Sequence, residues 1–444
     1  MFLQSFEKPV DWISTNICLP TRLSILGQRI HLNRHCAMAS TMVGLMFGVF
    51  ASYQAIILTL GEQIGNSEYS LGTGPYSQTE FGMDVNSSRN VYAVIFDAGS
   101  TGSRMHVYHF RKKQEWNVEL VHETFQQVKP GLSNYSADPH KGAESLHNML
   151  ESAIVEVPAK LQSQTPIVLK ATAGLRLLPN GVADHLLNEV SDLFRRTMFH
   201  QVEHGVEILG GSEEGIFSWV TVNYLEGAFH KNGEMVAALD LGGGSTQITF
   251  VPKDKETVES APDSYITRTN LFSRNYTLYT HSYLGLGLMS ARFRVLGGTE
   301  DEDDGASSSS ETLRSACLPP DHQFSWVHHG GRKFNVRGLG AEATPTLQST
   351  TTPSATVDSN LIDEVNGGSV LLKDFQEAAT QACGNPDKDD PFLCMDLTYI
   401  YSLLKDGYGL DLKSGIHVLK QIQKIEVSWT LGAAFQVLTS LGHL

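Results

Sequence analysis

The distribution of apolar and charged positions separates an N-terminal segment from a long globular part. Residues 36–60 contain no charged residue, and a helix over them would be about 37 Å long, enough to cross a bilayer core of about 30 Å. Basic residues predominate before this segment, whereas the first charges after it are acidic. The positive-inside rule therefore predicts a cytoplasmic tail at 1–35, an uncleaved signal anchor at 36–60, and the remainder of the chain across the membrane.

Beyond a polar, Gly- and Ser-rich stretch at 61–90, which we expect to form a stalk, strands and helices alternate. Apolar runs predict buried strands, and apolar residues at helical spacing predict helices. The strands are expected at 91–96, 105–110, 166–170 and 235–239, and the helices at 142–156 and 182–198. Such alternation is typical of an α/β fold.

Two stretches interrupt this pattern. An acidic, Ser-rich stretch lies at 299–312, and a Thr-, Ser- and Pro-rich stretch lies at 343–360. Neither composition can supply a packed core, so we expect the region 299–360 to be disordered or altered. Regular structure is expected to resume near Leu361 and to continue to the C-terminus.

Composition and charge narrow the classes of function. The chain has 444 residues, of which 41% are hydrophobic, which excludes a mostly disordered protein. It has 33 Lys and Arg against 48 Asp and Glu, a net charge of −15. No excess of cations exists to neutralise a phosphate backbone, so we expect no nucleic-acid partner. We infer no obligate protein partner either. A small phosphorylated ligand needs only a local site.

Placement across the membrane implies an oxidising compartment. Cys383 and Cys394 bracket a short Gly/Pro/Asp loop and are expected to form a disulfide, which leaves Cys317 over. Three Asn-X-Ser/Thr triplets are candidate glycosylation sites: Asn86, Asn134 and Asn275.

The candidate chemistry lies in two similar turns, at 97–104 and 240–247. Each begins with an aspartate at the end of an apolar strand, continues with Gly and Ser/Thr, and leads into another strand. Glycine lets the backbone approach a ligand closely, and successive N–H groups with nearby hydroxyls bind phosphate oxygens. Asp97 and Asp240 can instead hold a divalent cation, through waters if it is Mg²⁺. One such turn is a common hairpin, but two matching copies indicate a phosphate site.

Two further segments have both a structural and a functional interpretation. Residues 170–176 fit a strand-to-helix connection with Thr172 as the N-cap, and residues 210–215 fit a helix start at which acids are favoured by the dipole. The functional alternative for the second segment is a carboxylate that deprotonates a water attacking a terminal phosphate.

These four segments, in this order, resemble the conserved regions of the nucleoside triphosphate diphosphohydrolase family, also called the apyrase or nucleoside-diphosphatase family. The segments YLGLG at 283–287 and SWTLGA at 428–433 extend the resemblance. The residues of several motifs are similar to those of the lumenal, single-anchor branch of the family. Within this branch, the sequence resembles type 6 more than type 5. The family implies an actin/sugar-kinase/heat-shock-chaperone architecture of two RNase-H-like lobes. Lobe I would comprise 91–208 with 425–444, and lobe II 209–424.

The resemblance also implies roles for single residues. Glu214 matches the general base, and Asp97 and Asp240 match the carboxylates that hold Ca²⁺ or Mg²⁺, mostly through water. The groups that match the binding of phosphate or the positioning of the water are Ser100, Thr101, Gly102, Ser103, Thr172, Gly242, Gly243, Gly244, Ser245 and Gln247.

The implied function is metal-dependent hydrolysis of nucleoside diphosphates such as GDP, UDP and IDP, without a covalent phosphoenzyme. The implied setting is the Golgi or another secretory-pathway membrane, where the reaction supports lumenal glycosylation. A release of the lumenal part by cleavage stays open. Three alternatives also stay open: a broader apyrase that accepts triphosphates, a catalytically impaired pseudoenzyme, and a sugar kinase or chaperone ATPase.

The chain departs from the family in one region. Family members carry a longer segment with a Phe/Tyr-rich base-binding motif, and a cysteine partner for Cys317, between the YLGLG segment and the C-terminal part. The Thr-, Ser- and Pro-rich stretch at 343–360 stands in its place.

Overall fold

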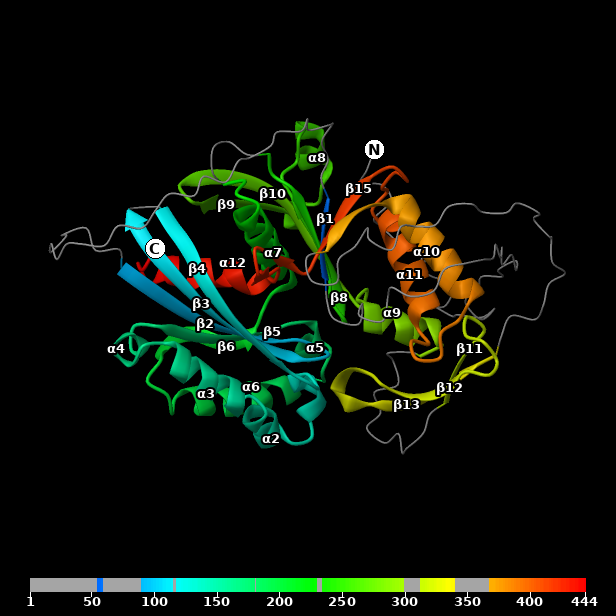
Figure 1. Ribbon diagram of the computed structural model, residues 1–444, viewed down its shortest axis with the longest axis horizontal. Coiled ribbons are helices and arrows are strands. Elements are labelled where there is room, and N and C mark those ends of the chain that lie inside the picture. Colours follow the sequence, from blue (N-terminus) through cyan, green and yellow to red (C-terminus); the bar gives the residue numbers. More distant parts are fainter. Residues whose placement is uncertain are drawn as a thin grey trace, which may run out of the picture.

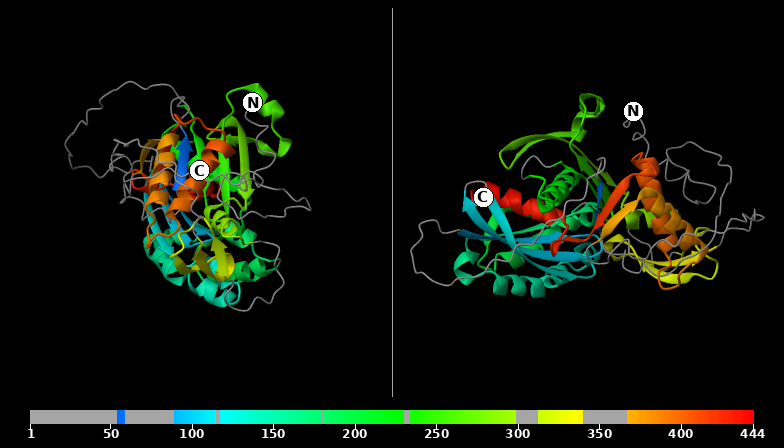
Figure 2. Two further views of the ribbon diagram at one scale, coloured as in Figure 1. Left: turned by 90° about the vertical axis from the view of Figure 1, so that its right-hand side faces the viewer. Right: turned by 45° about the horizontal axis from the view of Figure 1, so that its top comes forward.

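The computed structural model has mixed α and β structure in two lobes that lie side by side (Figure 1). We use lobe I for the elements around a five-stranded sheet and lobe II for those around a seven-stranded sheet. In the right-hand view of Figure 2, the cyan strands of lobe I lie on the left and the orange helices of lobe II lie on the right. The described residues are 54–58, 89–114, 117–179, 181–229, 234–298, 312–339 and 367–444. The predicted tail, most of the predicted anchor, nearly all of the stalk, and Asn86 lie outside them.

The sheet of lobe I has the strand order β4-β3-β2-β5-β6, in which β2, β3 and β4 are antiparallel and β5 and β6 run parallel to β2. Its strands are β2 (Arg89–Ala98), β3 (Ser103–Gln114), β4 (Asn117–Val128), β5 (Pro166–Ala171) and β6 (His200–Ile208). Its helices are η1 (Leu132–Tyr135), α2 (Pro139–Glu144), α3 (His147–Glu156), α4 (Ala159–Gln162), α5 (Ala173–Arg176) and α6 (Val182–Phe194).

The continuous apolar run of β2 is explained by cores on both faces of this sheet. Val94 and Phe96 pack into the core beneath α2, α3 and α6, whereas Ala93 and Ile95 pack into the core beside α7 (Gly211–Leu225) and α12 (Trp429–Ser440). All four side chains are 0% exposed. A strand buried on both faces has no need of polar alternation, as the sequence predicts.

Two helices form the junction between the lobes. α12 packs on β2 of lobe I, α7 packs on the sheet of lobe II, and the two helices pack on each other (Figure 1). The order of layers is therefore sheet, α12, α7, sheet. The chain enters lobe II at α7 and returns to lobe I through β16 (Gln421–Ile422), β17 (Ile425–Glu426) and α12.

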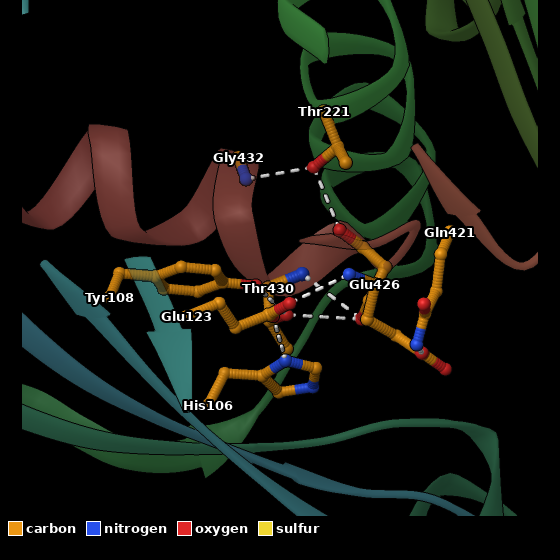
Figure 3. Close-up of polar contacts among 9 residues, drawn as sticks. His106, Tyr108, Glu123, Thr221, Gln421, Glu426, Thr430 and Gly432 are labelled. Atoms are coloured by element: carbon orange, nitrogen blue, oxygen red, sulfur yellow. Dashed lines mark hydrogen bonds and ion pairs between the residues drawn. The ribbon is translucent and has the colours of Figure 1, made fainter. Parts of the chain in front are cut away.

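A buried polar network fixes the returning chain to lobe I (Figure 3). Glu123 of β4 has one carboxylate oxygen 2.7 Å from His106 Nδ1, and the other accepts the backbone N–H of Glu426 at 2.6 Å. The hydroxyl groups of Tyr108 and Thr430 lie 2.8 Å apart. His106 and Tyr108 are alternate residues of β3 on one face of the strand, so a polar stripe of β3 faces the start of α12.

Thr221 connects the two junction helices (Figure 3). Its hydroxyl donates to the carbonyl oxygen of Ser428 at 2.7 Å and accepts the N–H of Gly432 at 3.0 Å. In a regular helix the N–H of Gly432 would donate to the carbonyl oxygen of Ser428, four residues earlier, so the Thr221 hydroxyl is inserted between these two groups at the start of α12.

The sheet of lobe II has the order β14-β15-β1-β7-β8-β10-β9. Its strands are β1 (Gln54–Leu58), β7 (Ala237–Leu241), β8 (Ser245–Phe250), β9 (Ile266–Leu271), β10 (Arg274–Leu284), β14 (Gly368–Leu371) and β15 (Gly415–Leu419). Its helices are α8 (Lys255–Ser260), η2 (Asp263–Tyr265), α9 (Leu288–Val295), α10 (Leu372–Gly384), α11 (Leu393–Ser402) and η4 (Leu403–Gly407). β7 and β8 repeat the strand, Gly-rich turn and antiparallel strand of β2 and β3.

The expectation of disorder within 299–360 is not met for residues 312–339, which are ordered. They form a three-stranded sheet of β11 (Thr312–Ser315), β13 (Lys333–Gly338) and β12 (Gln323–Val327), with η3 (His329–Gly331) between β12 and β13. Phe334 and Val336 alternate with exposed residues and join the core of lobe II. Two residues on one face of a short strand suffice to dock it, although polar tracts flank the segment.

Part of the predicted membrane helix has a different structure. Residues 54–58 form β1, which pairs antiparallel with both β7 and β15. Backbone groups that pair with neighbouring strands cannot also pair within a helix, so a helix over all of 36–60 does not agree with β1. None of the helices in the described ranges has the length and apolarity to cross a bilayer.

The predicted disulfide between Cys383 and Cys394 is confirmed. It joins the C-terminal part of α10 to the start of α11, with the two Cα atoms 4.6 Å apart. Cys317 is half-buried and forms no disulfide with another cysteine of the described residues.

We expect Ile56→Pro to destabilise lobe II, because proline removes an N–H from a strand that has a neighbour on each side. Ile56 lies opposite Leu239 on β7 and Val418 on β15. The free energy of unfolding should fall by more than about 1 kcal/mol, seen as a lower Tm of the full-length protein in detergent. Ile56→Val, which keeps the N–H, is the control. Equal Tm values for the two variants would show that β1 does not contribute to the sheet.

Candidate active site

A cleft of about 610 Å³, open to solvent, lies where the two Gly-rich turns approach each other. The first turn follows β2 in lobe I, and the second follows β7 in lobe II. Predicted site residues that line the cleft are Asp97, Ser100, Thr172, Glu214, Asp240, Gly242, Gly243, Gly244 and Ser245. The structure thus brings together residues from four separate segments of the sequence.

Close backbone contacts shape both turns. A Cβ atom on Gly174 would lie 2.6 Å from the Cα atom of Ser100, so only glycine lets α5 pack against the first turn. A Cβ atom on Gly287 would lie 2.4 Å from the carbonyl carbon of Gly243, so the YLGLG segment supports the second turn in the same way. These two glycines therefore allow the neighbouring segments to pack closely against the turns and so hold the turns in place.

Two aspartates face the cleft, and each has one carboxylate oxygen held by a donor from its own lobe. Asp97 Oδ2 accepts from Arg104 Nη1 at 2.9 Å, and Asp240 Oδ2 accepts from the hydroxyl of Ser218 at 2.7 Å. Burial raises the pKa of Asp97, against the effect of Arg104, and burial raises the pKa of Asp240 to about 6.

This donor set fits a divalent cation. Asp97 Oδ1 is buried and has no hydrogen-bond partner, which is costly for a carboxylate oxygen unless a cation or an ordered water meets it. Ca²⁺ and Mg²⁺ both prefer carboxylate and water oxygens. A bound cation would also relieve the repulsion from Asp97 that, after burial, raises the pKa of Asp240.

Glu214 lies in the first turn of α7 and is 6% exposed. Its Oε2 forms an ion pair with Arg176 of α5, across the cleft, and accepts from Gln247 Nε2 at 3.2 Å. Burial raises its pKa to about 8, although Arg176 opposes the shift. A glutamate with this pKa is suited to accept a proton near neutral pH.

The neighbouring Glu213 has a different role. Its carboxylate accepts the backbone N–H of Gly210 at 3.3 Å and so caps α7. The two interpretations of this segment are therefore divided between adjacent glutamates: Glu213 serves the helix start, and Glu214 faces the cleft.

Four predicted residues are not among those that line the cleft. Gln247 Nε2 also donates to Ser245 Oγ at 2.8 Å and to Ser282 Oγ at 2.9 Å, which fixes the amide beside Glu214. Ser103 is 1% exposed and begins β3. Thr101 follows Ser100 in the first turn, with its hydroxyl buried and without a partner. Gly102 accepts the N–H of Gly99 at 3.0 Å and closes that turn.

Thr172 occupies the N-cap position of α5, as its structural interpretation predicts, but its side chain makes no capping bond. Its hydroxyl therefore remains for the cleft that it lines. The residues that sequence reasoning missed are Arg104, Arg176, Ser218, Ser282 and Glu426. Arg104 and Arg176 lay inside motifs already singled out, and their positive charge was the available signal.

Comparison with known proteins gives the family. Residues 83–348 and 371–442 match the model of the GDA1/CD39 (nucleoside phosphatase) family. The chain belongs to this family. It is 41% identical over 387 residues to the human protein "Nucleoside diphosphate phosphatase ENTPD5", which covers 80% of this chain and 89% of that protein. It is 37% identical over 400 residues to human "Ectonucleoside triphosphate diphosphohydrolase 6", covering 83% and 82%.

The family match confirms the resemblance that the motifs indicated. The match in Gallus gallus, "Ectonucleoside triphosphate diphosphohydrolase 5", is also 41% identical, over 80% of this chain and 89% of that protein. Both types that the motif residues indicated, type 5 and type 6, are thus among the relatives of this nucleoside phosphatase family member. Its sequence identity to these type 5 proteins is higher than its identity to the human type 6 protein.

We expect Arg176→Met to move the acid limb of the pH–activity profile to higher pH. Arg176 lowers the pKa of Glu214, so its removal raises that pKa, and Glu214 accepts a proton only when it is ionised. The ratio kcat/KM at pH 7 should fall at least about tenfold, with recovery at higher pH. Arg195→Met, which removes an exposed arginine, is the control. An unshifted acid limb would remove Arg176 from this role.

Proposed function

We propose that this chain hydrolyses nucleoside diphosphates of the GDP, UDP and IDP type to the monophosphate and phosphate, with a Ca²⁺ or Mg²⁺ ion at Asp97 and Asp240 and Glu214 as the general base. The observation that carries the proposal is a buried glutamate, held by Arg176 and Gln247, in a cleft between two Asp-bearing Gly-rich turns. The printed name of a relative, nucleoside diphosphate phosphatase, supports the choice of substrate.

The residues divide the reaction between them. The backbone N–H groups of the two turns, with the hydroxyls of Ser100 and Ser245, bind the phosphates and hold the terminal phosphorus in line with a water. The cation supplies charge neutralisation on the phosphate oxygens. As the oxygen of the water forms a bond to phosphorus, its proton passes to Glu214. The anhydride bond breaks, and its electron pair leaves with the nucleoside monophosphate.

We further propose that the two lobes are RNase-H-like lobes of the actin/sugar-kinase/heat-shock-chaperone type, with lobe I at 91–208 and 425–444 and lobe II at 209–424. The repeated strand, turn and strand of β2–β3 and β7–β8 supports this. Residues of both turns line the same cleft, so one ligand could contact a phosphate-binding turn from each lobe.

We also propose a single-pass setting in a secretory-pathway membrane, with the catalytic part in the lumen. If β1 begins at Gln54, the uncharged residues 36–53 remain, and a helix over them is about 27 Å long, close to the thickness of a bilayer core. This shorter anchor is compatible with β1, whereas an anchor over all of 36–60 is not.

The test is phosphate release by the full-length protein, purified in detergent, from GDP, UDP, IDP, ADP and ATP with Ca²⁺, Mg²⁺ or EDTA. We expect cation-dependent release that favours the diphosphates. Comparable release from ATP would favour the broader apyrase. No release from a folded protein would favour the pseudoenzyme.

Glu214→Gln is the diagnostic variant for this test. It should bind nucleotide and lose turnover, because the amide cannot take the proton. Folding raises the pKa of Glu214 above 4.5, so this group lowers stability as pH rises from about 4.5 toward 8. In EDTA the variant should therefore match the parent near pH 5 and exceed its Tm at pH 8. Retained turnover would remove Glu214 as the base.

We expect Asn275 to carry a glycan. It is exposed near the turn between β9 and β10, and its side-chain oxygen accepts from Asn270 Nδ2 at 2.8 Å. Asn134 is less suited, because its amide nitrogen donates to Gly131 and its oxygen is buried against the η1–η3 contact. In a secretory host, Asn275→Gln should lose a glycosidase-sensitive mass shift that Asn134→Gln keeps. A shift unchanged in Asn275→Gln would contradict this.

A further inference from the structure

The two aspartates of the cleft are held by donors of different kinds. Asp97 is held by the charged guanidinium of Arg104, from the same motif. Asp240 is held by a neutral hydroxyl, that of Ser218, from a different element. The Asp97 contact stays within one hairpin, whereas the Asp240 contact joins a turn of the lobe II sheet to the helix that carries Glu214.

The packing around Ser218 does not by itself call for a polar side chain. It is 3% exposed, and its neighbours on α7, Phe217, Trp219 and Val220, belong to the core. A serine inside a buried helix usually bonds to a carbonyl of the preceding turn, which here would be that of Glu214. Its hydroxyl bonds to Asp240 instead, at 2.7 Å.

The position of Ser218 in α7 links it to the base. Glu214 and Ser218 are four residues apart, one helical turn, and so lie on the same face of α7. One face of a single rigid helix therefore presents Glu214 to the cleft and a donor to Asp240. The helix is fixed at its other end by Thr221, whose hydroxyl bonds to Ser428 and Gly432 (Figure 3).

We propose that Ser218 is a positioning residue of the cation site, which it serves by holding the carboxylate of Asp240 in one orientation toward the cleft. This inference rests on the proposed function, because it assumes that Asp240 holds the cation. Partners of this kind orient metal ligands, and their loss typically weakens metal affinity by 10- to 100-fold. A second consequence is a fixed distance between the cation and Glu214, since the same helix determines both.

The test is thermal unfolding of the full-length protein in detergent, without nucleotide, over a titration of Ca²⁺ or Mg²⁺. A cation that binds only the folded protein stabilises it by RT ln(1 + [cation]/Kd), so Tm begins to rise near Kd and then increases with the logarithm of the cation concentration. For Ser218→Ala we expect the cation concentration that gives the same rise in Tm to be 10- to 100-fold higher than in the parent. In turnover assays the cation requirement should increase in the same ratio, with a smaller change in kcat at saturating cation.

Thr221→Val is the matched control, because it deletes a buried hydroxyl three residues further along the same helix. It should lower Tm in EDTA, but a given cation concentration should raise Tm by the same amount as in the parent. If Thr221→Val shifted the cation titration as much as Ser218→Ala, the effect would belong to α7 as a whole, and a specific role of Ser218 would be overturned.

Two further outcomes separate this inference from the proposed function. A cation-induced rise that is the same in the parent and in Ser218→Ala would overturn the role of Ser218 and leave the cation site standing. No rise in the parent would overturn the cation site, and with it the role of Ser218. Asp240→Asn completes the set, since it should abolish the rise if the site is the proposed one.

Discussion

Three carboxyl groups of like charge converge on one cleft, and the rest of the molecule is arranged around the need to balance them. Asp97 comes from lobe I, Asp240 from lobe II and Glu214 from the junction helix α7. Each has at least one protein donor close by, but the charges of Arg104 and Arg176 do not offset the cost of burial, and all three groups have raised pKa values. Under the proposed function, a cation held by Asp97 and Asp240 would offset this charge, and a phosphorylated ligand would bind through it.

The balance of charge among the three carboxyl groups depends on the junction between the lobes, because the donors that contact these carboxyl groups come from both lobes. The ion pair between Arg176 and Glu214 spans lobe I and α7, whereas the contact between Ser218 and Asp240 stays on the side of lobe II. α12 and α7 lie between the two sheets, and the network of His106 and Glu123 fixes the chain that enters α12. A rotation of one lobe would change the environment of Glu214 before that of either aspartate.

What the sequence predicted well was local. The two turns and the start of α7 were visible because strand, aspartate and glycine follow one another in the chain, and the family that these motifs indicated is confirmed. The contact of Arg176 with Glu214 was not predictable, since it depends on how two lobes meet. Ser218 was hidden inside an apolar helical run. The uncharged run at 36–60 favours a helix by length alone, and nothing local reveals that β7 and β15 leave a place for β1. The strands within 312–339 were obscured by the polar tracts on either side.

The place of β1 has a consequence for the order in which the protein is made. β1 pairs with residues 237–241 and 416–419, so the centre of the lobe II sheet joins the first sixty residues of the chain to the last thirty. The packing of lobe I is also completed late, because α12, near the end of the sequence, covers one face of its sheet. Neither lobe can reach its final packing during synthesis, and both are completed only when the C-terminal residues have left the ribosome. Contacts so distant in sequence form slowly, and the open edges of β7 and β15 are exposed to other chains in that interval.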